Sequence, residues 1–362
     1  MRRRTVPAHI TALIPFMAVA LAASGADLAP QIDHILQTRL DAGEFNGTVL
    51  VARGDRVVYE RGFGFANLEW RIPNDSRTKF ELGSITKQFT ALLVLQFVNE
   101  GKIRLDRHLS DYLPYYRQDT GARVSIHHLL SHTSGIPNFI AAPGFLEGTA
   151  SRRRYGVQEF ALEHCSGDLQ FEPGTKFAYS NSGYFLLGAI LEEVSGKTYE
   201  QLLEQRIFGP LGMKDSGYTH TETILPNRAA GYERSPAGLR NARYYDMSIP
   251  FAAGALYSTA RDLYLWDEAL YTERLLPAKL RDLLFTPNLE NYGYGWGILI
   301  PAPGSPYAGE SIPMHGGAIF GFQAVIQRIP NHKELIVLLD NTESPKLLDI
   351  ALEIRRVLST TP

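Results

Sequence analysis

A serine and a lysine three residues apart stand before a long apolar segment. Ser84 and Lys87 precede the apolar run Leu92–Val98, and Gly101 follows as the stop signal of the segment. The pattern predicts a helix, and residues three apart on a helix share one face, so their side chains can meet. A serine becomes a nucleophile when a neighbouring base takes its proton, and burial shifts a lysine towards its neutral form. The start of the helix also offers unpaired N–H groups to an oxyanion, so the segment indicates a nucleophile with its base.

This spacing alone is a weak signal, because a second pair in the chain has it. Ser76 and Lys79 match the same pattern, but they precede no apolar run and follow the polar stretch 73–75, which indicates a solvated loop. For Ser84 the alternative is a serine that caps a helix, with an exposed lysine one turn later. Residues elsewhere in the chain must decide between these interpretations.

A tyrosine and an asparagine form the second candidate group. Tyr179 and Asn181 are two apart, and in extended backbone their side chains point the same way. The phenol could relay a proton, and the amide could hold a substrate carbonyl. Alternatively, the two residues only lead into the helix expected over 183–195.

The third candidate group is His315-Gly316-Gly317-Ala318, at the head of a predicted strand run that continues through Phe322. Two glycines without side chains would let a substrate lie against the strand edge. The N–H groups of Ala318 and Ser84 could then form a two-donor oxyanion hole. Alternatively, His315 is a surface histidine and the glycines make a turn.

The composition limits the other classes of chemistry. The chain has 362 residues, a formal net charge of −2 and one cysteine, Cys165, so an intrachain disulfide is excluded and no nucleic-acid partner is indicated. His128 and His132 have a spacing that could bind a metal on a helix, but no third ligand is evident. We therefore expect neither a metal nor a cofactor.

The first residues have the pattern of a signal peptide. Arg2, Arg3 and Arg4 precede the apolar stretch 10–23 and the small residues 24–26. We expect cleavage after Ala26, a mature chain 27–362 that is secreted or periplasmic, and no membrane span in it. The alternative is an uncleaved anchor.

The order of elements predicts an α/β (α+β) fold. A hairpin over 47–62 and a second over 322–339 lie near the two ends, with helices expected over 31–40 and 346–358 and strand-like sequence over 292–298. The region from about 105 to 289 is mainly helical. We expect one antiparallel sheet built from both chain ends, flanked by helices, with a helical inserted subdomain.

Together the three groups resemble the serine β-lactamase and penicillin-binding-protein superfamily, closest to class C β-lactamases, DD-carboxypeptidases and related esterases. The similarity extends over nearly the whole mature chain and includes 63–91, 129–136, 171–196, 207–213 and 254–270. The resemblance implies that Ser84 is acylated, that Lys87 is its base partner and that Tyr179 relays protons. It implies that Asn181 contacts the substrate amide, and that His315, Gly316 and Gly317 occupy the place of a Lys-Thr-Gly strand motif.

The last motif departs from the lactamase pattern, because His315 replaces the lysine and Gly316 the threonine. Both replaced residues normally help to hold a substrate carboxylate. We therefore expect a serine hydrolase that prefers esters among small-molecule esters, amides, D-amino-acid peptides and β-lactams. The alternatives are a D-alanyl-D-alanine carboxypeptidase, D-aminopeptidase or β-lactamase, and a non-catalytic penicillin- or peptidoglycan-binding relative.

Overall fold

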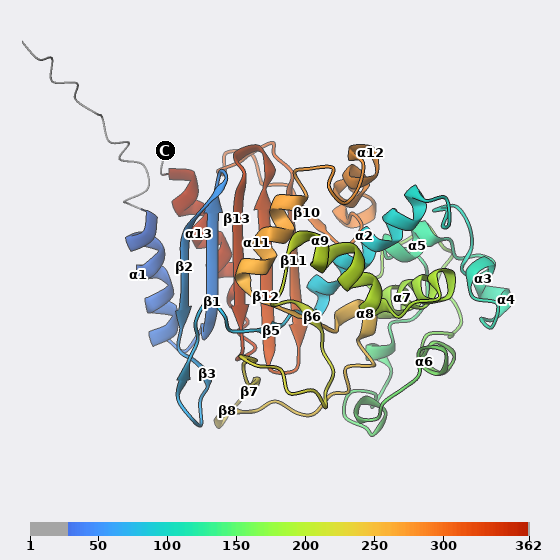
Figure 1. Cartoon of the computed structure of the whole chain (residues 1–362), viewed down its shortest axis with the longest axis horizontal. Helices are drawn as coiled ribbons and strands as arrows, with labels where there is room; N and C mark the ends of the chain where they lie inside the picture. Colours follow the sequence, from blue (N-terminus) through green and yellow to red (C-terminus); the bar gives the residue numbers. More distant parts are fainter. Residues whose placement is uncertain (1–27, 361–362) are drawn as a thin grey trace, which may run out of the picture.

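Strands from both ends of the chain form one antiparallel sheet in the computed structural model, which describes residues 28–360 (Figure 1). The expected signal peptide, 1–26, lies outside the described residues. The strand order is β10, β11, β12, β13, β1 and β2, with bounds Gly297–Leu299, Ile312–Ile319, Phe322–Ile329, Glu334–Asp340, Gly47–Arg53 and Arg56–Phe63, respectively. The predicted sheet of both chain ends is confirmed.

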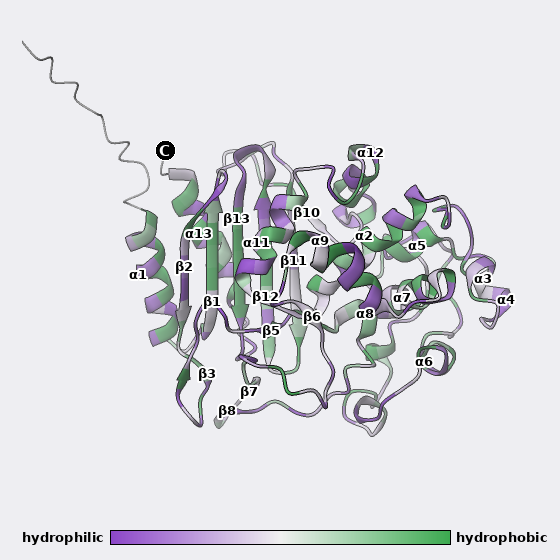
Figure 2. Ribbon diagram, viewed as in Figure 1, coloured by the Kyte–Doolittle hydropathy of each residue, from purple (hydrophilic) through white to green (hydrophobic). Residues whose placement is uncertain are grey.

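The strands β1 and β13 join the two ends of the chain in the middle of the sheet. They pair antiparallel from Gly47 opposite Asp340 to Arg53 opposite Glu334. Side chains alternate between the faces of a strand, and β1 buries Val49 and Val51 on one face and Leu50 and Ala52 on the other. Figure 2 shows β1 coloured largely hydrophobic. A strand of this kind must be covered on both faces.

Helices provide that cover. On one face, α1 (Leu28–Asp41) and α13 (Leu347–Thr360) pack against Val49 and Val51. On the other, α11 (Ala260–Ala269) lies against β1 and β13, and the larger core that contains Leu50 continues into α2. The helix α11 falls inside the range expected for the insertion, 105–289, yet it covers the sheet. Its apolar residues Leu263 and Trp266 are buried there.

The remaining helices lie mainly beside the sheet. Their bounds are α2 Thr86–Asn99, α3 Leu109–Tyr112, α4 Gln118–Gly121, α5 Ile126–Leu130, α6 Val157–His164, α7 Asn181–Ser195, α8 Tyr199–Leu203, α9 Gly209–Leu211, α10 Phe251–Gly254 and α12 Ala278–Arg281. Short strands also occur in this region: β5 Phe80–Glu81, β6 Gly217–Tyr218 and β9 Leu256–Ser258 form one small sheet, and β7 Tyr232–Ser235 pairs with β8 Gly238–Asn241. A further hairpin joins β3 Phe65–Asn67 to β4 Ile72–Pro73.

Two strand predictions differ from the structure. The strand-like sequence 292–298 is mostly loop, and β10 begins only at Gly297, because Gly295 takes a left-handed conformation at φ 75°. The His-Gly-Gly motif was expected at the head of a strand through Phe322. It lies instead on its own strand, β11, which turns back into β12 at Gly321.

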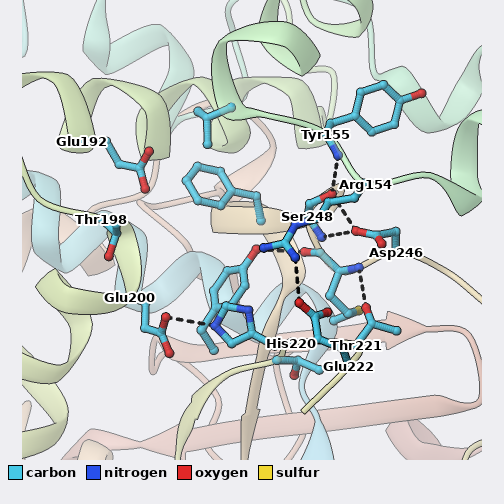
Figure 3. Close-up of a pocket in the computed structure, with 15 residues that line it drawn as sticks. Arg154, Tyr155, Glu192, Thr198, Glu200, His220, Thr221, Glu222, Asp246 and Ser248 are labelled. Atoms are coloured by element: carbon cyan, nitrogen blue, oxygen red, sulfur yellow. Dashed lines mark hydrogen bonds and ion pairs between the residues drawn. The ribbon is translucent and has the colours of Figure 1, made fainter.

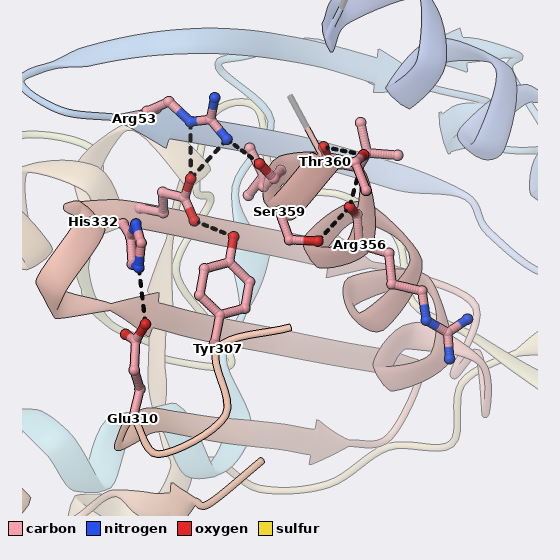
Figure 4. A network of polar contacts seen from close by, with 10 residues as sticks. Arg53, Tyr307, Glu310, His332, Arg356, Ser359 and Thr360 are labelled. Carbon is pink, nitrogen blue, oxygen red and sulfur yellow. Dashed lines mark hydrogen bonds and ion pairs between the residues drawn. The ribbon is translucent and has the colours of Figure 1, made fainter. Parts of the chain in front are cut away.

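A polar network holds the end of the chain against the sheet (Figure 4). Arg53 on β1 donates to Glu334 on β13 at 2.8 Å and to the carbonyl of Leu358 on α13. The hydroxyl of Tyr307 donates to the second oxygen of Glu334 at 2.7 Å. The network therefore links both chain ends with the loop before β11.

Within residues 28–360, none of the helices combines the length and the apolar character that crossing a bilayer requires.

One buried ion pair fastens α11 to the sheet. Arg328 on β12 donates to Asp267 at 2.7 Å, and both side chains are 3% exposed. Asp267→Ala leaves a buried guanidinium without its carboxylate, so we expect it to lower the free energy of unfolding by about 3–5 kcal/mol. Asp349→Ala, which breaks an exposed pair with Lys346, should cost less than about 1 kcal/mol. Urea unfolding of both variants measures the difference, and equal effects would contradict a structural role for the buried pair.

Candidate active site

Ser84 stands in a tight turn between the small sheet and the buried helix α2. The turn is a single 3-10 segment, η1 (Gly83–Ile85), which leads directly into α2 at Thr86. Gly83 has φ 51°, and a Cβ on it would lie 2.7 Å from the backbone nitrogen of Ala318. Glycine is thus required by both conformation and space. The turn therefore places the N–H of Ser84 next to β11.

Lys87 lies in the first turn of α2, and its side chain is fully buried. Its Nζ is 2.9 Å from Ser84 Oγ, 2.8 Å from Asn181 Oδ1 and 2.8 Å from the carbonyl oxygen of Ala253. These partners come from η1, α7 and α10. None of them is a carboxylate, so no negative charge compensates the amine.

Burial therefore lowers the pKa of Lys87 well below its ordinary value. A neutral amine has two N–H donors and one lone pair. The carbonyl oxygens of Asn181 and Ala253 accept the two donors, which leaves the lone pair for the hydroxyl proton of Ser84. The geometry is that of a serine whose base is already in place.

Tyr179 and Asn181 reach the same point from the start of α7. Asn138 Oδ1 accepts from the backbone N–H and the Nδ2 of Asn181, at 3.1 and 3.3 Å. This fixes the amide so that its oxygen faces Lys87. Sequence reasoning missed Asn138, because a single asparagine in a loop carries no recognisable pattern. The expectation that Tyr179 and Asn181 lie together beside Lys87 agrees with the structure.

The phenol of Tyr179 is protonated at neutral pH. Burial raises its pKa, and the neighbouring Ser84 side chain only partly opposes the rise. Its Oη has no hydrogen-bond partner within the described residues, and the Lys87 amine lies 4.9 Å from the ring centroid. Lys87 is therefore the better proton acceptor in the resting site, and Tyr179 the better donor.

The His-Gly-Gly strand presents a free edge to Ser84. The strand β10 pairs with β11 only as far as Met314, so beyond that residue η1 borders β11 instead. A Cβ on Gly317 would collide with the carbonyl of Leu82 and lie 3.3 Å from the Ser84 nitrogen. Gly317 thus permits the contact that brings the N–H groups of Ser84 and Ala318 to one place, as an oxyanion hole requires. Gly316 is exposed and has room for a side chain.

His315 lies on the wall of this site as a neutral ring. Its Nδ1 donates to the carbonyl of Gly316 at 2.6 Å, and its Nε2 accepts from the hydroxyl of Tyr292 at 3.0 Å. Burial is the largest cause that lowers the pKa of His315, to about 4. Both ring nitrogens are engaged inside the protein, so His315 offers no fixed positive charge to a substrate.

A cavity of about 550 Å³ opens over Ser84. Every predicted site residue except Lys87 lines it, and Lys87 lies beneath its floor. The rest of the wall is mainly apolar and aromatic: Phe139, Ile140, Leu146, Tyr245, Pro250, Ile319 and Phe320. Among the described residues that line it, Glu343 alone is an acid and none is a lysine or arginine.

The two other candidate pairs do not form comparable sites. Ser76 is exposed, but the expectation of a solvated loop is wrong for Lys79, which is 8% exposed and pairs with Asp215 at 3.1 Å. The helix α5 ends at Leu130, so His128 and His132 do not share a helix face.

A second, smaller cavity of about 190 Å³ shares no residue with the first. Figure 3 shows its polar side chains joined to one another: Arg154 to Glu222 at 2.7 Å, His220 to Glu200 at 2.9 Å and Ser248 to Asp246 at 2.6 Å. These groups satisfy each other. No nucleophile in this cavity has a base beside it in the way that Ser84 has Lys87.

Comparison with known proteins agrees with this geometry. The sequence profile described as Beta-lactamase matches residues 32–358. A Bacillus subtilis (strain 168) protein named as a penicillin-binding protein is 30% identical over 337 residues, which are 86% of this chain and 71% of the relative. Among solved structures, a penicillin binding protein from Bacillus halodurans superposes with a TM-score of 0.80 at 29% identity, over 89% of this chain and 98% of the other.

A second solved structure, the D-amino acid amidase from Ochrobactrum anthropi SV3, has a TM-score of 0.80 at 26% identity and covers 92% of this chain and 98% of its own. Fold and relatives together define a serine hydrolase. The chain belongs to the Beta-lactamase family. The resemblance inferred from the sequence is thereby confirmed, whereas the roles of the individual residues remain predictions.

Ser84→Ala removes the candidate nucleophile, and we expect kcat to fall by about 10⁴–10⁶ with the fold intact. Ser76→Ala, at the other Ser-x-x-Lys pair, is the matched control and should leave kcat unchanged. Ester hydrolysis by the two variants, with mass spectrometry after fluorophosphonate treatment, makes the comparison. A label on the Ser84→Ala variant would show that another residue is acylated.

The adjacent glycines provide a second test. Gly317→Ala forces β11 away from η1 and separates the two N–H groups, so we expect kcat to fall by about 10²–10³, as for a lost oxyanion donor. Gly316→Ala, where the added methyl meets no atom closer than 3.9 Å, should cost much less. Steady-state kinetics on one ester compares the pair. Similar losses would mean that close packing at Gly317 has no special role.

Proposed function

We propose that the protein is an exported serine hydrolase that acts through an acyl-Ser84 intermediate and prefers uncharged esters. The observation that carries the substrate preference is the absence of a lysine or arginine among the described residues that line the cavity. The neutral state of His315 supports it. Export rests on the N-terminal sequence pattern.

The reaction begins when Ser84 Oγ attacks the substrate carbonyl carbon and Lys87 Nζ takes the hydroxyl proton. The carbonyl oxygen becomes an oxyanion, which accepts hydrogen bonds from the N–H groups of Ser84 and Ala318. Collapse of this intermediate breaks the bond to the leaving alcohol, which receives a proton through Tyr179. Water then attacks the acyl-Ser84 ester and gives a proton to the same groups; the bond between the acyl carbon and Ser84 Oγ breaks, Oγ takes that proton back, and the acid is released.

Charge separates the ester preference from the β-lactamase alternative. β-Lactams with a carboxylate need a cation in the cavity, and a lost charge-assisted contact costs about 1.5–3 kcal/mol. That corresponds to about one to two powers of ten in kcat/KM. Esters of short uncharged acids make no such contact and lose nothing.

A second candidate substrate is an amide or ester that bears an ammonium group. Glu343 supports it, because one of its oxygens accepts from the N–H of Gly321 at 2.8 Å and the acid is only half-buried. Arg240 and Arg243 lie near Glu343, but both pair with Glu233, at 2.7 and 2.9 Å, and so do not pair with Glu343. The similar structure named as a D-amino acid amidase agrees with this candidate.

Kinetics with p-nitrophenyl butyrate and a cephalosporin test the proposal. We expect measurable ester turnover and slow or stoichiometric reaction with the β-lactam. Glu343→Gln removes the acid from the cavity, so the cephalosporin should gain rate by up to about tenfold while butyrate hydrolysis changes little. A kcat/KM for the cephalosporin far above that for the ester would overturn the ester preference and leave the Ser84 chemistry standing.

A further inference from the structure

His132 lies directly behind the candidate proton carrier Tyr179. It follows α5 in a left-handed conformation at φ 57° and is 1% exposed. Its carbonyl oxygen accepts from the N–H of Ala178 at 2.9 Å, and its Nδ1 accepts from the N–H of Ser180 at 3.2 Å. One residue thus binds the backbone on both sides of Tyr179.

The imidazole ring also packs against the tyrosine itself. The ring centroids of His132 and Tyr179 are 4.2 Å apart, and those of Tyr184 and Tyr292 lie 5.0 and 4.7 Å from His132. Tyr292 is the residue that donates to His315. The His132 ring therefore occupies the centre of an aromatic cluster that supports two of the three motifs.

Only one protonation state of His132 can make the bond to Ser180. Nδ1 accepts a hydrogen bond only when the ring is neutral with its proton on Nε2. Burial is the largest cause that lowers the pKa of His132, which lies well below its ordinary value. Nε2 is buried without a hydrogen-bond partner within the described residues, so the hydrogen bond of the ring is the one that Nδ1 accepts from Ser180.

We infer that His132 is a positioning residue that holds the Tyr179 phenol in line with Ser84 and Lys87. This inference rests on the proposed function. Tyr179 Oη has no hydrogen bond of ordinary geometry within the described residues. Among the ring contacts of Tyr179, the one to His132 is the shortest, at 4.2 Å against 6.3 Å for Tyr292 and His315. The backbone bonds and the ring contact of His132 are therefore a main support of the phenol's position. A small misplacement of a catalytic group can cost as much as about a hundredfold in rate.

Two substitutions separate the hydrogen bond from the bulk of the side chain. In His132→Asn, the amide oxygen can stand where Nδ1 stands, and asparagine tolerates the left-handed conformation. In His132→Leu, the volume is filled but the buried N–H of Ser180 loses its acceptor. The matched control is His164→Asn, because His164 packs in another aromatic cluster, with its ring 4.7 Å from Phe160.

For p-nitrophenyl butyrate we expect His132→Leu to lower kcat by about tenfold to one hundredfold with little change in KM. His132→Asn should recover most of that loss, and His164→Asn should leave kcat unchanged. In a Tyr179→Phe background, His132→Leu should cost less than about twofold more, since the phenol it positions is already gone.

Losses that multiply in the double variant would overturn the inference, as would equal kcat values for the Asn and Leu variants. A loss confined to KM would also overturn it. Thermal unfolding shows whether each variant is folded. If the Leu variant does not fold, the Asn variant alone still tests the inference. A Tyr179→Phe enzyme with full activity would instead contradict the proposed mechanism, so the two failures are distinguishable.

Discussion

The buried amine of Lys87 is the constraint on which the site depends. A lysine that is fully buried without a carboxylate partner is stable only when it is neutral and its donors are satisfied. Here the two acceptors are the carbonyl oxygens of Asn181 and Ala253, from separate segments, and Ser84 is the third neighbour of the amine. The two oxygens that make the burial tolerable also fix the amine where its lone pair meets the Ser84 hydroxyl. The hydrogen bonds that stabilise the buried amine are therefore the same ones that orient it as a base.

That arrangement also explains the charge of the surrounding cavity. A carboxylate beside Lys87 would keep the amine protonated and remove its function as a base. A permanent cation nearby would repel the protonated amine and so oppose the proton transfer from Ser84 to Lys87. The neighbouring bases His132 and His315 are accordingly buried and neutral, each with its acceptor nitrogen facing a donor from Ser180 or Tyr292. The substitution of His315 for a lysine fits this environment.

The sequence was sufficient to predict which groups come together. Tyr179, Asn181 and His315 to Ala318 line one cavity with Ser84, and Lys87 lies within hydrogen-bond distance of Ser84. The contribution of Ala253 could not be predicted, because a backbone carbonyl has no residue-type signature. The aromatic support by His132 and Tyr292 was missed for a similar reason: ring packing between distant segments has no fixed spacing. The late start of β10 at Gly297, opposite Met314, leaves the rest of the β11 edge free, and it depends on tertiary packing that a local pattern does not record.

The pairing of β1 with β13 has a consequence for how the protein becomes active. Gly47 and Asp340 are partners across almost the whole chain, and contacts of such sequence separation form late and slowly during folding. Ser84 and Lys87 belong to the early part of the chain, whereas Ala318 arrives with the last strands. A chain that is still being synthesised can hold the nucleophile and its base, but it has no complete oxyanion hole. On the proposed mechanism, hydrolytic activity would therefore begin only when the two chain ends have met.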